Sequence, residues 1–322
     1  MSRLACLLFL LTPAICAAQF TYAPVNVPGA VATEARGINN SGEIVGFYKT
    51  AACADYDIKV PNCPTEGFKY VNGSYIRLMV PGSITTAILG VNDYGDLVGF
   101  YSEKVSSCSN PVFHGFIWYH QNVVKTIDYP GADGCNNYSN YEVTGTTVPF
   151  GINTAGTVVG GIWGITPTGA FPNTGWVWVD GKFSVMNPGQ VTGSSTCCWS
   201  VNGISNNGIL SGQVFRADFW EAWMKESTDD DFYMNHEDTF GTGLNSNVDT
   251  VGYSGANGWI VKSLEANEGS GGSEKEANPA FTPLAYPGSG STLPFGFNDH
   301  RAVVGTYSDS TNVLHGFMAT AD

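Results

Sequence analysis

Six copies of one short motif recur along this chain, and they restrict its fold more than any other feature. The motif reads Gly-x-Asn-x-x-Gly-x-x-Val-Gly, and its first glycines are Gly37, Gly90, Gly151, Gly203, Gly243 and Gly296. These glycines lie 40 to 61 residues apart, which is the length of one four-stranded propeller blade with variable loops. The repeat therefore predicts an all-β protein, a six-bladed β-propeller.

The chemistry of the motif predicts a tight hairpin between the first two strands of each blade. Asn, Ser or Asp followed by glycine supplies the left-handed backbone conformations that such a turn needs. The closing glycine allows two backbones to approach where a side chain would not fit. In the fifth and sixth copies Val248 and Arg301 replace the middle glycine. We expect altered turns there, with nearby Asn or His residues tolerating the positive φ, and no missing blade.

Further strands follow each hairpin. Third strands are predicted at 67–70, 114–118, 175–178, 220–224, 258–260 and 315–317, and fourth strands end in Pro-Gly steps at Pro81, Pro130, Pro188 and Pro287. The fourth copy instead runs through 232–240 without such a step, and 265–278 reads as a flexible turn.

The two ends of the chain predict how the ring closes. Residues 20–29 resemble a fourth strand with no first three before it, and 315–317 form a third strand with nothing after it. Pairing the two segments completes the last blade and removes an open sheet edge. We therefore expect the N-terminal strand to close the propeller.

The first eighteen residues have the pattern of a secretory signal. Arg3 gives a positive start, Leu4 to Leu11 an apolar core, and Cys16-Ala17-Ala18 a small-residue cleavage site. We expect a signal peptide over 1–18, one propeller domain over 19–322, and a secreted or periplasmic location. The apolar core is too short to span a membrane and no later segment is long enough, so no membrane insertion is predicted.

Composition narrows the partners and the chemistry. The formal net charge of −14 argues against nucleic acid and anionic membranes as partners. The sequence contains no Gly-x-Ser-x-Gly elbow, His-Glu-x-x-His motif, phosphate loop or EF-hand loop. We expect no organic cofactor and a monomeric chain. No metal site is assigned, although abundant Asp and Asn leave a structural calcium ion open.

Six cysteines remain after the signal, and an even number in an exported chain predicts disulfides. Proximity favours the pairs Cys53–Cys63, Cys108–Cys135 and Cys197–Cys198. Because six cysteines allow fifteen pairings, Cys197 and Cys198 could instead pair with Cys108 or Cys135.

Two short elements carry a resemblance to a known family. His114-Gly115-Phe116 and His315-Gly316-Phe317 accompany the Gly-x-Asn motifs and the Pro-Gly-Ala steps at 28–30 and 130–132. Together they resemble the extracellular repeat family named after a His-Ala-Phe-type repeat (HAF). The resemblance covers nearly all of 19–322 and implies a repeat propeller, but no activity for particular residues. Copies one, three, four and five depart from the His-Gly-Phe form.

Loop lengths predict a binding face. Propeller geometry puts the long segments 49–65, 102–113, 132–148, 164–174 and 190–200 on one face, together with all six cysteines. Insertions on one face of a repeat fold typically form its binding surface.

Candidate site residues fall at that face. The ionisable candidates for catalysis are Glu34, Glu142, His236, Glu237 and Asp238, and the candidates for substrate binding are Tyr48, Tyr101, Trp163, Trp199, Arg216, Tyr253 and Tyr307. Aromatic rings and carboxylates suit a sugar site, since rings stack on C–H faces while acids act on the glycosidic oxygen. Packing between blades for the rings, and a solvated loop for 236–238, are the alternatives.

Two functions stay open from the sequence. The first is a carbohydrate-directed protein, a glycan binder or a glycoside hydrolase or polysaccharide lyase. The second is a non-catalytic extracellular scaffold whose loops bind another protein.

Overall fold

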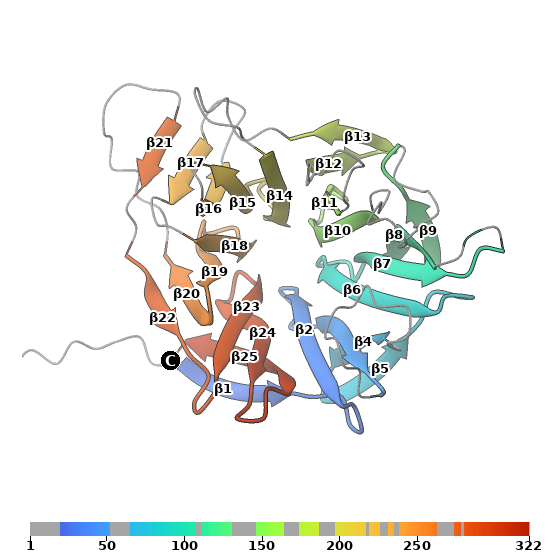
Figure 1. The fold of residues 1–322 in the computed structure, drawn as a ribbon, viewed down its shortest axis with the longest axis horizontal. Helices are drawn as coiled ribbons and strands as arrows, with labels where there is room; N and C mark the ends of the chain where they lie inside the picture. Colours follow the sequence, from blue (N-terminus) through green and yellow to red (C-terminus); the bar gives the residue numbers. More distant parts are fainter. Residues whose placement is uncertain are drawn as a thin grey trace, which may run out of the picture.

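The computed structural model describes residues 20–51, 65–106, 108, 111–130, 146–163, 174–186, 197–216, 219–225, 231–234, 238–262, 274–277 and 280–321. These residues form six antiparallel-based sheets that stand like blades around a central axis (Figure 1). The predicted six-bladed β-propeller is confirmed. No helix long and apolar enough to cross a membrane occurs in this part of the chain.

The blades follow one another in chain order. Blade one contains β2 (Ala32–Ile38), β3 (Ile44–Lys49), β4 (Thr65–Val71) and β5 (Ser74–Leu78). Blade two contains β6 (Thr85–Val91), β7 (Leu97–Glu103), β8 (Val112–Tyr119) and β9 (Val123–Ile127). Blade three contains β10 (Thr146–Ile152), β11 (Val158–Trp163), β12 (Gly175–Val179) and β13 (Lys182–Val185).

The second half of the ring repeats this plan. Blade four contains β14 (Cys197–Ile204), β15 (Leu210–Arg216), β16 (Phe219–Lys225), β17 (Asp231–Met234) and β21 (Glu274–Ala277). Blade five contains β18 (Thr239–Leu244), β19 (Thr250–Ser254), β20 (Asn257–Val261) and β22 (Thr282–Leu284). Blade six contains β23 (Ser291–Phe297), β24 (Ala302–Ser308), β25 (Leu314–Ala321) and the N-terminal β1 (Phe20–Val25).

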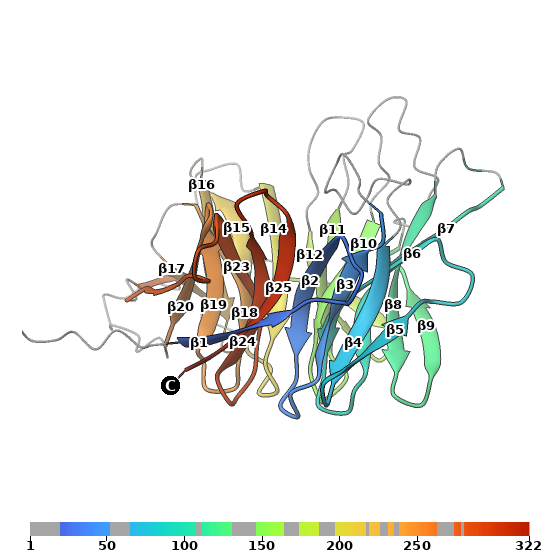
Figure 2. The ribbon, with the colours of Figure 1, turned by 90° about the horizontal axis from the view of Figure 1, so that it is seen from below.

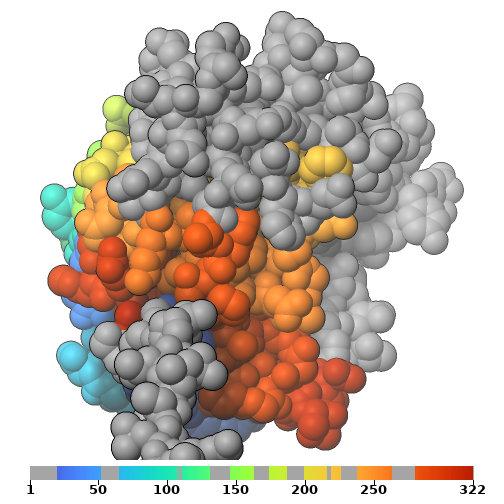
Figure 3. All heavy atoms as spheres, turned by 90° about the vertical axis from the view of Figure 1, so that its left-hand side faces the viewer, coloured from blue at the N-terminus to red at the C-terminus, as the bar shows by residue number. Residues whose placement is uncertain are grey.

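The ring closes as the two chain ends predict. Strand β1 pairs antiparallel with β25, from Phe20 opposite Ala321 to Val25 opposite Gly316. Tyr22 of β1 also packs edge-on against Tyr286, and its hydroxyl oxygen accepts a hydrogen bond from the backbone amide of Ala285. Figure 3 shows the outer side of the ring, where the orange atoms of blade five lie against the red atoms of blade six.

The six motifs form the hairpins between the first and second strand of every blade. Their turns gather at one end of the ring, the lower edge of Figure 2, which we call the hairpin face. At each closing glycine, such as Gly46 or Gly99, a Cβ atom would overlap a carbonyl oxygen of the first strand. The predicted close approach of the two backbones is therefore confirmed.

Val248 and Arg301 do not alter their turns, contrary to expectation. Both residues take the left-handed conformation themselves, with φ of 66° and 61°, where the other copies have glycine. The amides of Val248 and Arg301 donate to the carbonyls of Asn245 and Asn298, as Gly42 donates to Asn39. The surrounding strand pairing thus imposes one turn geometry on all copies. At Val248 and Arg301 this geometry is sterically strained, because a residue with a Cβ atom disfavours the left-handed conformation.

Blade four departs from the prediction in two ways. Residues 232–240 are not one strand, because β17 ends at Met234 and β18 of the next blade begins at Thr239. The predicted flexible turn at 265–278 also contains β21, which pairs parallel with β17. The outer edge of β17 has unpaired backbone groups, and β21 satisfies them as a fifth strand.

The motif asparagine ties each blade to the next. Asn92 is buried, its Oδ1 accepts the amide of Asp96 within its own turn, and its Nδ2 donates to the carbonyl oxygen of Asn153 in blade three. The corresponding side-chain bonds join Asn39 to Asn92, Asn153 to Ser205, Asn245 to Asn298, and Asn298 to Asn39. We call this set the asparagine ring.

The asparagine ring is interrupted at blade four, where the motif carries Ser205. Its hydroxyl accepts the amide of Ile209, which keeps the turn, but a serine has no amide group to reach the next blade. Asn207 substitutes by donating from Nδ2 to the carbonyl of Ser246. The junction between blades four and five is therefore built differently from the other five.

Replacement of Asn92 by alanine should destabilise the propeller strongly. The change removes the acceptor of the Tyr94 and Asp96 amides and one of the two donors to the carbonyl of Asn153, which keeps the amide of Gly156. We expect the free energy of unfolding to fall by about 2–3 kcal/mol, measured by urea denaturation. Tyr94→Ala, at a side chain 64% exposed on the same turn, is the control. Equal effects of the two changes would contradict the role of the ring.

Ser205→Asn should have the opposite effect. An asparagine at this position can keep the turn bond and add a donor toward the carbonyl of Asn245, completing the ring. We expect a gain of roughly 0.5–1.5 kcal/mol in the free energy of unfolding by the same measurement. A loss of stability would show that blade four is adapted to its serine.

Candidate functional site

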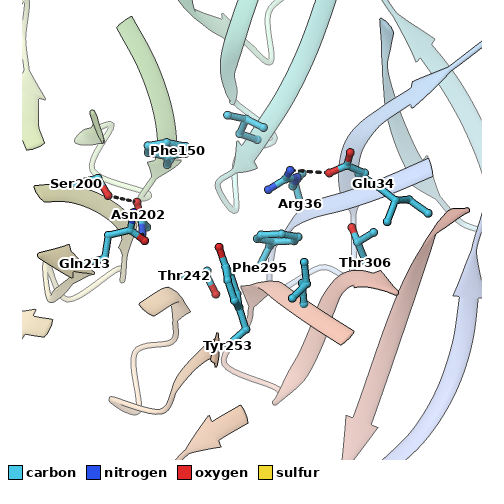
Figure 4. A pocket seen from close by; sticks show the side chains of 13 residues that line it. Glu34, Arg36, Phe150, Ser200, Asn202, Gln213, Thr242, Tyr253, Phe295 and Thr306 are labelled. Carbon is cyan, nitrogen blue, oxygen red and sulfur yellow. Dashed lines mark hydrogen bonds and ion pairs between the residues drawn. The ribbon is translucent and has the colours of Figure 1, made fainter. Parts of the chain in front are cut away.

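A pocket of about 340 Å³ lies on the propeller axis and is lined by all six blades (Figure 4). In every blade the first strand shifts register at the residue before the motif glycine. Such a bulge re-aims one side chain. The six re-aimed residues all line the pocket, and they are Arg36, Leu89, Phe150, Asn202, Thr242 and Phe295.

The pocket lies on the side of the ring away from the hairpin face. Further lining residues lie two positions before the bulge residue in the first strand, such as Glu34 and Ser200, or on the second strand, such as Gln213, the cross-strand partner of Ser200. First strands begin at the face where β3 ends at Lys49 and β4 begins at Thr65. This is the face at which the long loops were predicted.

One wall of the pocket holds an ion pair. An Nη2 atom of Arg36 donates to Oε2 of Glu34 at 2.6 Å, and Glu34 is buried. The Arg36 guanidinium also lies 3.9 Å from the ring centre of Phe295 and 5.3 Å from that of Phe47. Cation–π attraction and the ion pair together hold this guanidinium in one orientation at the pocket.

The opposite wall is polar and uncharged. The Ser200 hydroxyl donates to Oδ1 of Asn202, whose Nδ2 donates to the carbonyl of Gly241 and lies 3.5 Å from Oε1 of Gln213. Ser200 and Gln213 are cross-strand partners on β14 and β15, so the pairing itself places both at the pocket. Amide and hydroxyl groups of this kind can donate to and accept from a polar ligand.

Aromatic rings fill much of the remaining lining. Tyr253 and Phe295 meet edge to face with their ring centres 6.3 Å apart, and Tyr253 stacks on Phe240 at 5.0 Å. Burial raises the pKa of the Tyr253 hydroxyl above its usual value of 10.0, although the charge of Arg36 opposes the shift. The hydroxyl therefore stays protonated at neutral pH and can act as a donor.

Two polar atoms at the pocket have no hydrogen-bond partner within the described residues. They are Nε of Arg36 and Oγ1 of Thr306, and Thr306 is 2% exposed. Buried polar groups are normally paired, because an unpaired one costs about 1–3 kcal/mol.

The structure brings two of the predicted site residues, Glu34 and Tyr253, into this pocket. Tyr48, Tyr101 and Tyr307 instead belong to the apolar clusters between neighbouring blades, and Tyr48 shares one with Ala302 and Val304 of blade six. The reason is register. Tyr253 directly follows its closing glycine, whereas these three tyrosines lie one residue later and so point to the other face of the sheet.

The remaining candidates lie elsewhere or outside the described residues. Asp238 is exposed and accepts the amide of Trp220, and Trp199 is half-buried and donates to the carbonyl of Met186. Glu142, His236 and Glu237 are outside the described residues, as are the side chains of Trp163 and Arg216. Of the cysteine side chains only that of Cys108 is described, half-buried in the β7–β8 connection, so the disulfide pairs stay predictions.

All six pocket residues at the bulge position, Phe150 included, were missed in the sequence analysis. The sequence does contain a signal for them, because each residue directly precedes a motif glycine. The residue type at this position differs between copies, for example Arg36 and Thr242, while the neighbouring motif positions repeat. What the repeat could not show is the bulge that turns this position toward the axis. Within the described residues, no group of three or more His, Cys, Asp or Glu is placed to bind a metal ion.

By its fold and its axial pocket, this protein belongs to the class of six-bladed propellers with a pocket on the axis. The Hadza microbial sialidase Hz136 superposes with a TM-score of 0.53 at 11% identity, covering 91% of this chain and 66% of that one. A Trypanosoma rangeli sialidase gives 0.49 at 9% identity, covering 95% and 56%. A gluconolactonase from Xanthomonas campestris gives 0.48 at 11% identity, covering 97% and 93%.

These similarities are similarities of fold alone. This chain spans less than two thirds of the length of either sialidase chain. No protein-family model matches the sequence, and no curated protein does.

The tyrosines packed between blades should make the protein sensitive to alkali. Burial and the neighbouring Glu66 carboxylate, which accepts the Tyr48 hydroxyl at 2.5 Å, raise the pKa of Tyr48 to about 12. A folded-state pKa above the unfolded value of 10.0 contributes stability that is present below pH 10 and lost as the pH rises toward about 12.

Urea denaturation across this pH range checks the expectation. Tyr48→Phe should flatten part of the alkaline loss of stability, with the remainder arising from Tyr307, whose pKa is also raised to about 12, and from other tyrosines with a raised pKa, such as Tyr253. Tyr94→Phe, at an exposed ring, is the matched control and should leave the profile unchanged. An unchanged profile for Tyr48→Phe would contradict the assignment.

Proposed function

We propose that this chain is a secreted carbohydrate-directed propeller that binds a glycan in the axial pocket. The observation that carries the proposal is the composition of the pocket. Aromatic rings, the Glu34–Arg36 ion pair and an amide–hydroxyl wall converge on one cavity. Sugars present apolar C–H faces and many hydroxyl groups at once, and this lining offers a partner to each.

The described lining favours binding over hydrolysis. Most glycosidases use two carboxyl groups about 5–10 Å apart on either side of the scissile bond, although sialidases use a tyrosine as nucleophile. Glu34 is the single carboxylate among the described residues of the pocket, and Arg36 already holds one of its oxygens. A hydrolase or lyase mechanism would need a second acid, for which Glu142 and Glu237 are the sequence candidates.

The proposed location rests on the sequence. The signal pattern over 1–18 and the even number of cysteines after it both favour export. The net charge of −14 would keep such a chain soluble and away from nucleic acid and anionic membranes.

Variants of the pocket test the proposal. The purified protein is titrated with cellulose, chitin, xylan and polygalacturonate oligosaccharides, and binding is followed by intrinsic tryptophan fluorescence and calorimetry. We expect Arg36→Gln and Phe295→Ala each to weaken binding about tenfold or more, which corresponds to at least about 1.4 kcal/mol. Tyr94→Ala on the hairpin face is the matched aromatic control and should bind as the parent does.

The melting temperature of each variant shows whether it folds. Absence of binding to every glycan, or binding that neither pocket variant weakens, would refute the proposal. The second outcome would move the site away from the axis, and the first would favour a protein-binding scaffold.

A further inference from the structure

The floor of the axial pocket is made by the six motif glycines. They line a small continuation of the channel, of about 70 Å³, directly below the bulge residues. The first strands touch there, since a Cβ atom on Gly37 would lie 3.1 Å from Cα of Gly90, and one on Gly296 would lie 3.0 Å from Cα of Gly37. Neighbouring first strands are thus closely packed, and the channel that they surround keeps about 70 Å³ at this level.

Below the glycines, a polar network closes the channel at the hairpin face. Nδ2 of Asn206 in blade four donates to Oδ2 of Asp93 in blade two at 2.9 Å. Blade three separates these blades in the ring, so this bond reaches across the channel. Nδ2 of Asn40 bonds to both Asp93 and Asp299, each at 2.9 Å. We call this network the polar plug, and it encloses about 50 Å³.

The pocket is consequently blind. Among the described residues the polar plug spans the channel at the hairpin face, so a ligand reaches the bulge residues from the loop face. A polymer cannot thread the channel. A chain lying across the mouth would miss the bulge residues, such as Arg36 and Asn202, which line both the pocket and its narrow continuation.

We infer that the axial pocket receives one end of a glycan chain, so that the protein recognises chain termini and not internal stretches. This inference rests on the proposed function, since it names how the same site takes its ligand. The volume of about 340 Å³ lies at the lower end of small-molecule pockets, which run from about 300 to 1,000 Å³. It suits a terminal sugar unit and leaves the rest of the chain at the mouth.

Ladders of cello-, chito-, xylo- and oligogalacturonide oligomers, from disaccharide to hexasaccharide, test the inference on the full chain. Each oligomer is used free, with a biotin hydrazide at its reducing end, and with a methyl ether blocking its non-reducing end. End-on binding predicts that affinity stops rising after the first two or three units. It also predicts that a block at one end costs tenfold or more at every length, while a block at the other end is tolerated.

The variant Arg36→Gln gives a second readout. If the terminal unit carries recognition, the fold-loss of affinity is the same for the disaccharide and the hexasaccharide. Affinity that keeps rising with length, with either end of the hexasaccharide blocked at no cost, would overturn end-on recognition while leaving glycan binding intact. No binding in any ladder would overturn the proposed function itself, and the inference with it.

Discussion

The side-chain amide of the motif asparagine is the interaction on which the rest of this structure depends. One oxygen caps the hairpin of its own blade and one nitrogen reaches the carbonyl of the next, as Asn92 does between Asp96 and Asn153. Both atoms are buried, so neither bond can be exchanged for water without cost. A single residue type thus sets both the local turn and the spacing of neighbouring blades.

That spacing creates the conditions for a site. Blades held this close bring the motif glycines of adjacent first strands into contact, as Gly37 with Gly90 and Gly296 with Gly37, where a side chain would crowd the neighbouring backbone. At the residue before each of these glycines the first strand bulges. The bulge sends one side chain per blade to the axis. The bulge is shared by all blades, and it therefore places six side chains at the axial pocket whose residue types can differ from blade to blade.

These six positions explain why the lining of the pocket differs from side to side although the six blades share one backbone plan. Arg36 and Phe295 make one wall charged and aromatic, while Asn202 makes the facing wall an amide network. Because Glu34 and the cation–π contacts hold Arg36 in place, its remaining N–H groups are presented in a defined direction. The closed hairpin face, with Asn206 bonded to Asp93, gives the cavity one mouth.

Much of the fold could be predicted from the repeat, but only part of the candidate site could be predicted from the sequence. Glu34 and Tyr253 were found because they are a carboxylate and an aromatic ring near the loop face, and both line the pocket. Tyr48, Tyr101 and Tyr307 were grouped with Tyr253 by type, although a shift of one residue turns them to the opposite side of the sheet. The strand β21 was missed because its pairing partner, β17, lies 40 residues earlier.

The sequence by itself determined the number of blades, the hairpin in each and the closure of the ring by β1 and β25, because these follow from local turn chemistry and from the count of repeats. The tertiary structure decided which residues meet. Where Val248 and Arg301 lack the expected glycine, the packed neighbours still impose the left-handed turn. Where Arg36 precedes Gly37, the strand bulges beside the contact of Gly37 with Gly90 of the next blade, and Arg36 lines the axial pocket. Both outcomes depend on neighbouring blades, which no single repeat encodes.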